Sequence, residues 1–132
     1  MERAMDFLPF ARVSSFMPMK IAMYIPVLES LFSESDGDIS FKVSERCACY
    51  LGGTQDEKMA IFKTVRRSYD LRSKLLHGSQ VDPSVNNPED QIKLSIEIDE
   101  VVRRILKQAI LIDHEKFRKG GDTVFYNELL FT

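Results

Sequence analysis

Apolar residues recur along this chain at the three- and four-residue spacing of amphipathic helices, and no long stretch alternates as a half-buried strand does. Prolines and paired glycines separate the periodic stretches, with Gly52-Gly53 and Gly120-Gly121 as the clearest breaks. The expected helices cover residues 3–16, 18–32, 40–51, 54–78 and 91–119, with a short last helix at 123–131. The pattern predicts an all-α fold, a helical bundle of four to five main helices.

Three of these stretches show a defined apolar side. The second has Pro26 inside it, which predicts a kink or a break, and its apolar side carries Ile21, Tyr24, Ile25, Leu28 and Phe32. In the fourth, Thr54 followed by Glu57 has the spacing of a capping box. The expected buried stripe of this fourth helix is Phe62, Val65, Tyr69 and Leu76, and that of the fifth is Ile98, Val101, Val102, Ile105, Ala109 and Ile112.

Size and charge restrict the class of protein. The 132 residues predict a single domain, residues 1–132, which is either a whole protein or a piece of a larger one. A formal net charge of −2 argues against nucleic-acid binding over the whole surface and leaves room only for a local basic patch. No segment has the roughly 20 apolar residues that span a bilayer, and the start lacks the order of a signal peptide. We therefore expect a cytoplasmic protein without a membrane partner.

Two cysteines, Cys47 and Cys49, are separated by one residue. On a helix their side chains diverge by about 200°, so a disulfide between them is disfavoured and free, mostly buried thiols are expected. Cys-x-Cys together with the scattered His77 and His114 does not have the spacing of a zinc site. Neither a metal nor a cofactor is therefore expected.

The strongest candidate chemistry is the segment Tyr69-Asp70-Leu71-Arg72-Ser73-Lys74-Leu75-Leu76-His77-Gly78 at the end of the fourth helix. Arg72 offers a fixed cation, and His77 is a side chain that can transfer protons near neutral pH. Ser73 precedes His77 by four positions, so its hydroxyl lies on the same side of the helix and can orient the imidazole. Arg72 and His77 themselves lie about 140° apart around the helix. This combination suits work on a phosphodiester.

The same residues have a structural interpretation. A histidine in the last turn before a glycine is common, because imidazolium complements the exposed carbonyl groups at a helix end. Exposure distinguishes the two interpretations: a His77 that is buried and bonded only within its own chain favours the structural one.

Basic residues crowd the fourth helix, where Lys63, Arg66, Arg67 and Lys74 accompany Arg72 and are candidates for RNA binding. The alternative is an ordinary solvated face, with Arg66 paired to Asp70 one turn later.

Glu29 lies in an apolar run of the second helix, so it either faces water or has a buried partner. We expect a supporting pair of Glu29 with Lys42 or Arg46 on the third helix, in preference to a catalytic acid.

The order of these segments resembles the HEPN domain, and within it the Apea-like branch. The matching pieces are Leu28-Glu29-Ser30-Leu31-Phe32, Lys42-Val43-Ser44-Glu45-Arg46 followed by Leu51-Gly52, and the Arg-x4-His segment that ends at Gly78. The position after Arg72 is Ser where many ribonuclease members have Asn. The Arg-x4-His spacing alone is unspecific, and the ordered set of three carries the resemblance.

The resemblance implies a four- to five-helix bundle that forms a homodimer through its second and fourth helices. Many members are metal-independent endoribonucleases of toxin–antitoxin and antiviral defence systems, in which two copies of the motif share one cleft. Carried onto this chain, Arg72 and His77 are the catalytic candidates with Ser73 beside them. RNA would be the substrate, and a regulatory or antitoxin chain a further partner. Other members only bind or scaffold, so a non-catalytic interaction or RNA-binding module is the alternative.

Overall fold

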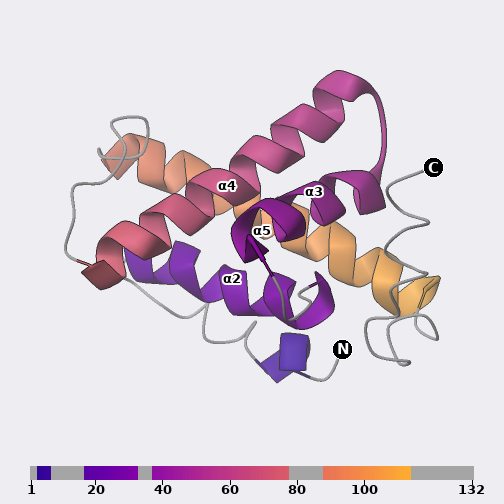
Figure 1. Cartoon of the computed structure of the whole chain (residues 1–132), viewed down its shortest axis with the longest axis horizontal. Coiled ribbons are helices and arrows are strands. Elements are labelled where there is room, and N and C mark those ends of the chain that lie inside the picture. The colour runs from indigo at the N-terminus through magenta and orange to yellow at the C-terminus, as the bar shows by residue number, and fades with distance from the viewer. Residues whose placement is uncertain (1–2, 7–16, 33–36, 78–87, 114–132) are drawn as a thin grey trace.

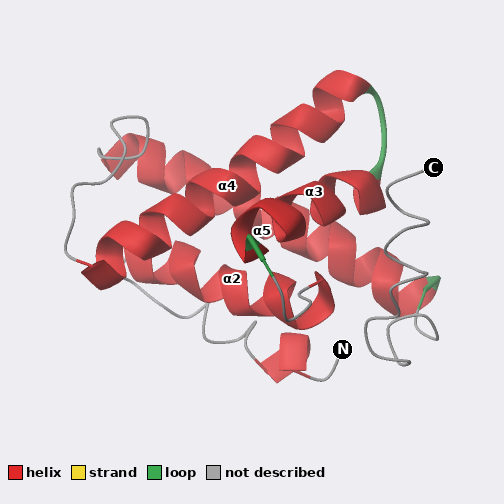
Figure 2. Ribbon diagram, viewed as in Figure 1, coloured by secondary structure: helices red, strands yellow, loops and turns green. Residues whose placement is uncertain are grey.

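The computed structural model describes residues 3–6, 17–32, 37–77 and 88–113. Beyond a short helical turn at residues 3–6, four helices follow: α2 (Met17–Phe32), α3 (Ile39–Leu51), α4 (Gln55–His77) and α5 (Pro88–Leu111). The described residues contain no strand (Figure 2), which confirms the predicted all-α bundle. None of the described helices is long and apolar enough to cross a membrane. Residues 7–16 of the first expected helix, most of the loop after Gly78, His114 and the expected helix at 123–131 lie outside the described residues.

Helix α4 crosses in front of α5, α3 returns beside α4, and α2 runs along the lower part of the view in contact with both α4 and α5 (Figure 1). The predicted apolar side of α2 is buried in full, and α2 runs through Pro26 as one helix without a break. The main core cluster includes the fully buried side chains of Tyr24, Phe32, Ile25, Leu28, Val65, Ile98 and Ile105. Helix α2 is therefore the element on which α4 and α5 pack.

The buried stripe of α4 differs from the predicted one. Val65 and Tyr69 are buried, but Leu76 is 71 % exposed and Leu71 is buried instead, packed with Ile21 and Leu94. The buried residues of α4 are Ile61, Thr64, Val65, Ser68, Tyr69 and Leu71. The hydrophobic pattern did not predict this face in full, because Thr64 and Ser68 are polar residue types. Both are satisfied: Ser68 donates to the Thr64 carbonyl oxygen at 2.9 Å, and Thr64 donates to Glu97 at 3.4 Å.

The junction between α3 and α4 follows the sequence closely. Gly52 has a φ of +70° and its N–H donates to the Ala48 carbonyl, which ends α3. The predicted capping box is confirmed: the Thr54 N–H donates to Glu57 Oε2 at 2.7 Å, and the Glu57 N–H donates to Thr54 Oγ1 at 3.2 Å. At the other end of α3, Asp38 accepts from the Phe41 N–H at 3.1 Å and is the N-cap, which places the start at Ile39.

Both ends of α5 differ from the prediction. The helix begins at Pro88, three residues early, because proline fits the first helical position and Glu89 and Asp90 complement the helix dipole. It ends at Leu111, where the amides of both Ile112 and Asp113 donate to the Gln108 carbonyl. Ile112 is 76 % exposed, so its predicted burial was wrong. Residues 114–119 of the expected helix lie outside the described range.

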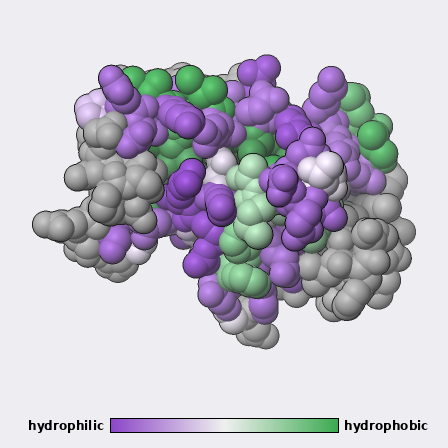
Figure 3. Space-filling model, turned by 90° about the horizontal axis from the view of Figure 1, so that it is seen from above, coloured by the Kyte–Doolittle hydropathy of each residue, from purple (hydrophilic) through white to green (hydrophobic). Residues whose placement is uncertain are grey.

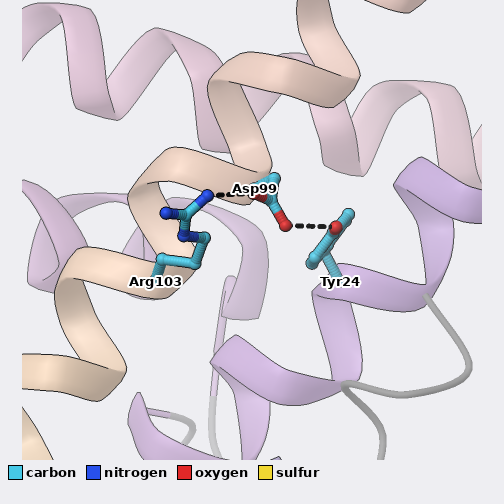
Figure 4. A network of polar contacts seen from close by, with 3 residues as sticks. All are labelled: Tyr24, Asp99 and Arg103. Carbon is cyan, nitrogen blue, oxygen red and sulfur yellow. Dashed lines mark hydrogen bonds and ion pairs between the residues drawn. The ribbon is translucent and has the colours of Figure 1, made fainter. Parts of the chain in front are cut away.

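Polar contacts tie the helices together at several points. Tyr24 of α2 donates to Asp99 of α5 at 2.6 Å, and Arg103, one turn later, contacts the other carboxylate oxygen at 3.4 Å (Figure 4).

Cys47 is buried and Cys49 half-buried, and both are free thiols, as predicted. Burial raises the pKa of the Cys47 thiol far above its ordinary value, which keeps it protonated and unreactive.

Candidate functional site

Arg72 occupies a well-defined position between α2 and α4. Its guanidinium donates to Glu29 Oε1 at 2.6 Å and lies 5.1 Å from the centre of the Tyr69 ring. The two charged side chains remain partly accessible, at 31 % for Arg72 and 25 % for Glu29. The expected pairing of Glu29 with Lys42 or Arg46 was therefore wrong. Because α2 packs directly on α4, Glu29 faces α4 and meets Arg72 there.

Arg46 has a different role. It is buried, and its guanidinium donates to the carbonyl oxygen of Phe32, the last residue of α2. The last carbonyls of a helix lack intrahelical donors, so a cation at this place satisfies one of them and complements the helix dipole. Arg46 thus supports the fold. Lys42, the other expected partner of Glu29, lies four residues earlier on the same helix and is half-buried.

A cavity of about 430 Å³ opens beside Arg72. Glu29 of α2 and Ser40 of α3 line it, together with Arg66, Tyr69, Asp70 and Ser73 of α4. The structure thus brings Arg72, Ser73, Arg66 and Glu29 to one place. The charged residues that line the cavity are two arginines and two carboxylates, namely Arg66, Arg72, Glu29 and Asp70.

Arg66 and Asp70 do not form the pair considered from the sequence. Arg66 instead donates to Ser40 Oγ across the gap to α3. Asp70 Oδ2 is buried and has no hydrogen-bond partner in the described part of the chain. The hydroxyl of Tyr69, a residue only 7 % exposed, is also buried and also lacks a hydrogen-bond partner within the described residues. A buried polar atom without a partner costs free energy, so these two atoms are an unfavourable feature of the second half of α4 as it stands.

The Tyr69 hydroxyl stays neutral at all ordinary pH values. Burial raises its pKa most, the negative charge of Glu29 adds to the increase, and the positive charge of Arg72 opposes it. A neutral phenol keeps its proton, so Tyr69 is available as a hydrogen-bond donor as well as an acceptor.

The remaining basic residues of α4 do not gather around Arg72. Lys63 and Arg67 are exposed and line a separate cavity of about 700 Å³ between α4 and α5, where Glu97 and Glu100 lie beside them. Lys74 is half-buried. Seen from above, the molecule has a largely hydrophilic surface interrupted by separate hydrophobic patches (Figure 3).

His77 is the last residue of α4, but its side chain and Gly78 lie outside the described residues. Because α4 is continuous from Gln55 to His77, the backbone positions of Arg72 and His77 differ by about 140° around the axis and about 7.5 Å along it. The two residues therefore occupy different sides of the helix.

Two contributors to the cavity were missed as functional residues. Tyr69 was assigned to the apolar stripe, and Asp70 was considered only as a partner for Arg66. No spacing in the sequence reports that one oxygen of a carboxylate is buried without a donor. In the described part of the chain, no cluster of three or more His, Cys, Asp or Glu side chains is arranged to hold a metal ion.

Comparison of the chain with models of protein families, with curated proteins and with solved structures gives no match. The functional argument accordingly depends on the residues themselves.

Proposed function

We propose that this protein is a metal-independent endoribonuclease of HEPN type, with Arg72 and His77 as its catalytic residues. The observation that carries the proposal is the position of Arg72: partly exposed at a cavity, and held from two sides by Glu29 and Tyr69. An ion pair of this exposure contributes only about 0–1 kcal/mol, so a phosphate can exchange for Glu29 at small cost.

The mechanism needs no metal. His77 acts as general base on a ribose 2′-hydroxyl, or as general acid toward the departing 5′-oxygen, while the 2′-oxygen attacks the adjacent phosphorus. The Arg72 guanidinium stabilises the charge that develops on the phosphoryl oxygens. Ser73, exposed and four residues before His77, orients the imidazole. This chemistry cleaves RNA and leaves DNA intact, because DNA lacks the 2′-hydroxyl.

The site is composite, formed by two copies of the chain. The divergence of Arg72 and His77 on one helix supports this, since a second copy can bring its own pair to the same cleft. Leu76 also supports it, because this large apolar side chain lies on the cavity and is 71 % exposed. We infer a symmetric homodimer with α4 near the two-fold axis. Light scattering at micromolar concentration tests it, and a stable monomer would contradict it.

RNA is the substrate of the proposed enzyme, and its cleavage is the direct test. A labelled single-stranded RNA is incubated with the protein in EDTA, alongside a His77→Ala variant. General acid–base catalysis contributes roughly 10²–10⁴-fold, so the variant should lose cleavage by that factor. The matched control is His114→Ala, which removes the other histidine of the chain and should cleave normally. Cleavage that survives His77→Ala, or that stops on addition of EDTA, contradicts the mechanism.

The second candidate is a non-catalytic interaction or RNA-binding module of the same family. The Arg72–Glu29 pair favours it, because an arginine held by a carboxylate serves structure equally well. A parent protein that binds varied RNAs but cleaves none of them would select this candidate.

A further inference from the structure

Two arginines of α4 line the same cavity, and each is bound to a different neighbouring helix. Arg72 donates to Glu29 of α2 at 2.6 Å, and Arg66 donates to Ser40 Oγ of α3. Arg66 and Arg72 are six positions apart, which corresponds to a rise of about 9 Å along the helix. The cavity therefore has two positively charged groups, spaced along α4, that neighbouring helices hold in place.

The partner of Arg66 leaves its charge available to a ligand. Ser40 is neutral, whereas Glu29 carries a negative charge that compensates Arg72. Arg66 is half-buried and makes no ion pair within the described part of the chain. Its guanidinium has several N–H donors, so one bond to a hydroxyl leaves donors for an anion such as a phosphate.

The other basic residues predicted to bind RNA lie elsewhere. Lys63 and Arg67 line the separate cavity between α4 and α5, where Glu97 and Glu100 stand beside them. Among the described residues, Lys74 lines neither cavity. Of the four predicted cations, Arg66 is therefore the one that the fold brings to the cavity of Arg72.

We propose that Arg66 binds a second phosphate of the RNA, next to the phosphate that Arg72 contacts, with Ser40 positioning its guanidinium. The proposal rests on the proposed function, since it states what the substrate of that same site must contain. Contacts to phosphate fix the register of a nucleic acid and carry no base information. The site thus selects an internal segment of a polynucleotide, with a charged phosphate beside the one that is attacked.

The carboxylates of the cavity limit the strength of this second contact. Glu29 and Asp70 line the cavity too, and their negative charges oppose a polyanion. We therefore expect a gain of about tenfold, the lower end for a hydrogen bond to a charged group. The second phosphate takes no part in bond breaking, so its contact is made equally in the ground state and the transition state. Such a contact lowers KM and leaves kcat unchanged.

Cleavage of oligonucleotides with one removable charge tests the proposal. The substrates are thymidine decamers with a single central ribonucleotide, A, C, G or U in turn, so that 2′-hydroxyl attack can cleave only one bond. In the matched substrates, the linkage on one or the other side of that bond is a methylphosphonate, which keeps the bases and the length and removes one negative charge. For the parent protein, kcat/KM should fall about tenfold at one of the two positions, through a higher KM.

The variant is Arg66→Gln, which keeps an N–H donor for Ser40 and removes the charge. It should cleave the charged and the methylphosphonate substrates with equal kcat/KM. The matched control is Arg67→Gln, the same change at the next residue, which lines the other cavity and should keep the tenfold difference. Urea unfolding verifies the fold of both variants. An arginine that only joins α4 to α3 would not make cleavage depend on the charge of a phosphate.

The salt dependence of binding is a second measurement, which does not need cleavage. The probe is a 2′-O-methyl uridine decamer, and the slope of log Kd against log salt should fall by about 0.7 in Arg66→Gln, the value for one phosphate contact of a single strand. It decides the matter if no decamer is cleaved. Equal cleavage of charged and methylphosphonate substrates by the parent, or an unchanged salt slope in Arg66→Gln, overturns the second contact and leaves the proposed function intact. Absence of cleavage of any RNA overturns the proposed function, whatever the salt slope.

Discussion

At its first turn, α4 satisfies its polar groups with residues three positions away, whereas its second half depends on side chains from α2 and α3. Thr54 and Glu57 exchange two hydrogen bonds across a single turn. Arg72, by contrast, reaches a carboxylate 43 positions earlier in the chain, and Arg66 reaches a serine 26 positions earlier. The first turn closes these bonds locally, whereas the second half leaves the Tyr69 hydroxyl and Asp70 Oδ2 without a hydrogen-bond partner among the described residues.

The comparison shows where stability and chemistry are separated within one helix. A capping box contributes to the helix whatever surrounds it, so that end is suited to stability. Groups that depend on distant partners or have none are free to change partners, so that end is suited to a ligand. Substitutions at the two ends should therefore have different consequences, one on unfolding and the other on activity.

The largest effect is expected for Arg72→Ala, which should reduce RNA cleavage by about 100-fold or more, because a charge-stabilising donor is lost from the transition state. Its free energy of unfolding should change by less than about 1 kcal/mol, since the ion pair that it breaks is partly exposed. Arg72→Lys should recover little cleavage, as lysine cannot present the planar fork to a phosphate. Full cleavage by Arg72→Ala would show that the second half of α4 is structural too.

The next effect belongs to the first turn of α4. Gly53 has a φ of +100°, and an added methyl group would lie 2.2 Å from Glu57 Oε2. Gly53→Ala should therefore lower the free energy of unfolding by about 1–3 kcal/mol, and Thr54→Ala by about 1 kcal/mol. Urea unfolding measures both changes, and cleavage by the folded variants should be unaffected. Gln55→Ala, an exposed change in the same turn, is the control and should alter stability little.

An effect of pH is expected from Tyr69. Its pKa is raised from 10.0, mainly by burial, so the folded state favours the neutral hydroxyl. The stability that this contributes is full below about pH 10 and is lost as the pH rises toward the folded pKa. Unfolding monitored between pH 10 and 11 should show a loss of up to about 1.4 kcal/mol from this group, which Tyr69→Phe removes.

The alkaline loss of stability can be measured for Cys47 in the same way as for Tyr69. Burial raises its pKa from 9.0, so the corresponding loss begins one pH unit lower and should be relieved by Cys47→Ala. Identical alkaline profiles for the parent and Tyr69→Phe would contradict the burial of the tyrosine hydroxyl.

The smallest effect concerns the Arg72–Glu29 pair. A double-mutant cycle with Glu29→Gln and Arg72→Gln should give a coupling energy of about 0.2–1 kcal/mol, because both side chains remain partly hydrated. The coupling should shrink further in 1 M salt, where the screening length is about 3 Å. A coupling energy above about 2 kcal/mol would show that the Arg72–Glu29 pair behaves as a buried structural contact. It would also argue against a phosphate replacing Glu29 at Arg72.

Local features of the fold were predictable from the sequence. The apolar side of α2, the glycine end of α3 and the Thr54–Glu57 box depend on residues within a turn or two of each other, where spacing determines contact. The buried stripe of α4 was predicted only in part, because Thr64 and Ser68 are polar by type and are buried only through bonds to Glu97 and to the helix backbone.

The contacts of the candidate site were even less predictable from the sequence than the buried face of α4. The importance of Arg72 was indicated by the motif, but its partner Glu29 depends on how α2 lies on α4, and no spacing encodes that. Asp70 and Tyr69 became candidates only when their unpaired atoms and the cavity beside them were seen together.

The connection through residues 52–54 also determines how the chain folds. It joins α3 and α4 through two glycines and a capping box, so these two helices meet after closing a very short loop. Such neighbouring contacts form early in helical proteins, whereas those that join α2 to α4 wait for long loops to close. We expect high φ-values around Val43, Cys47 and Val65 and low ones at Glu29 and Arg72. The end of α4 that carries the candidate site would then be among the last parts of the molecule to become ordered.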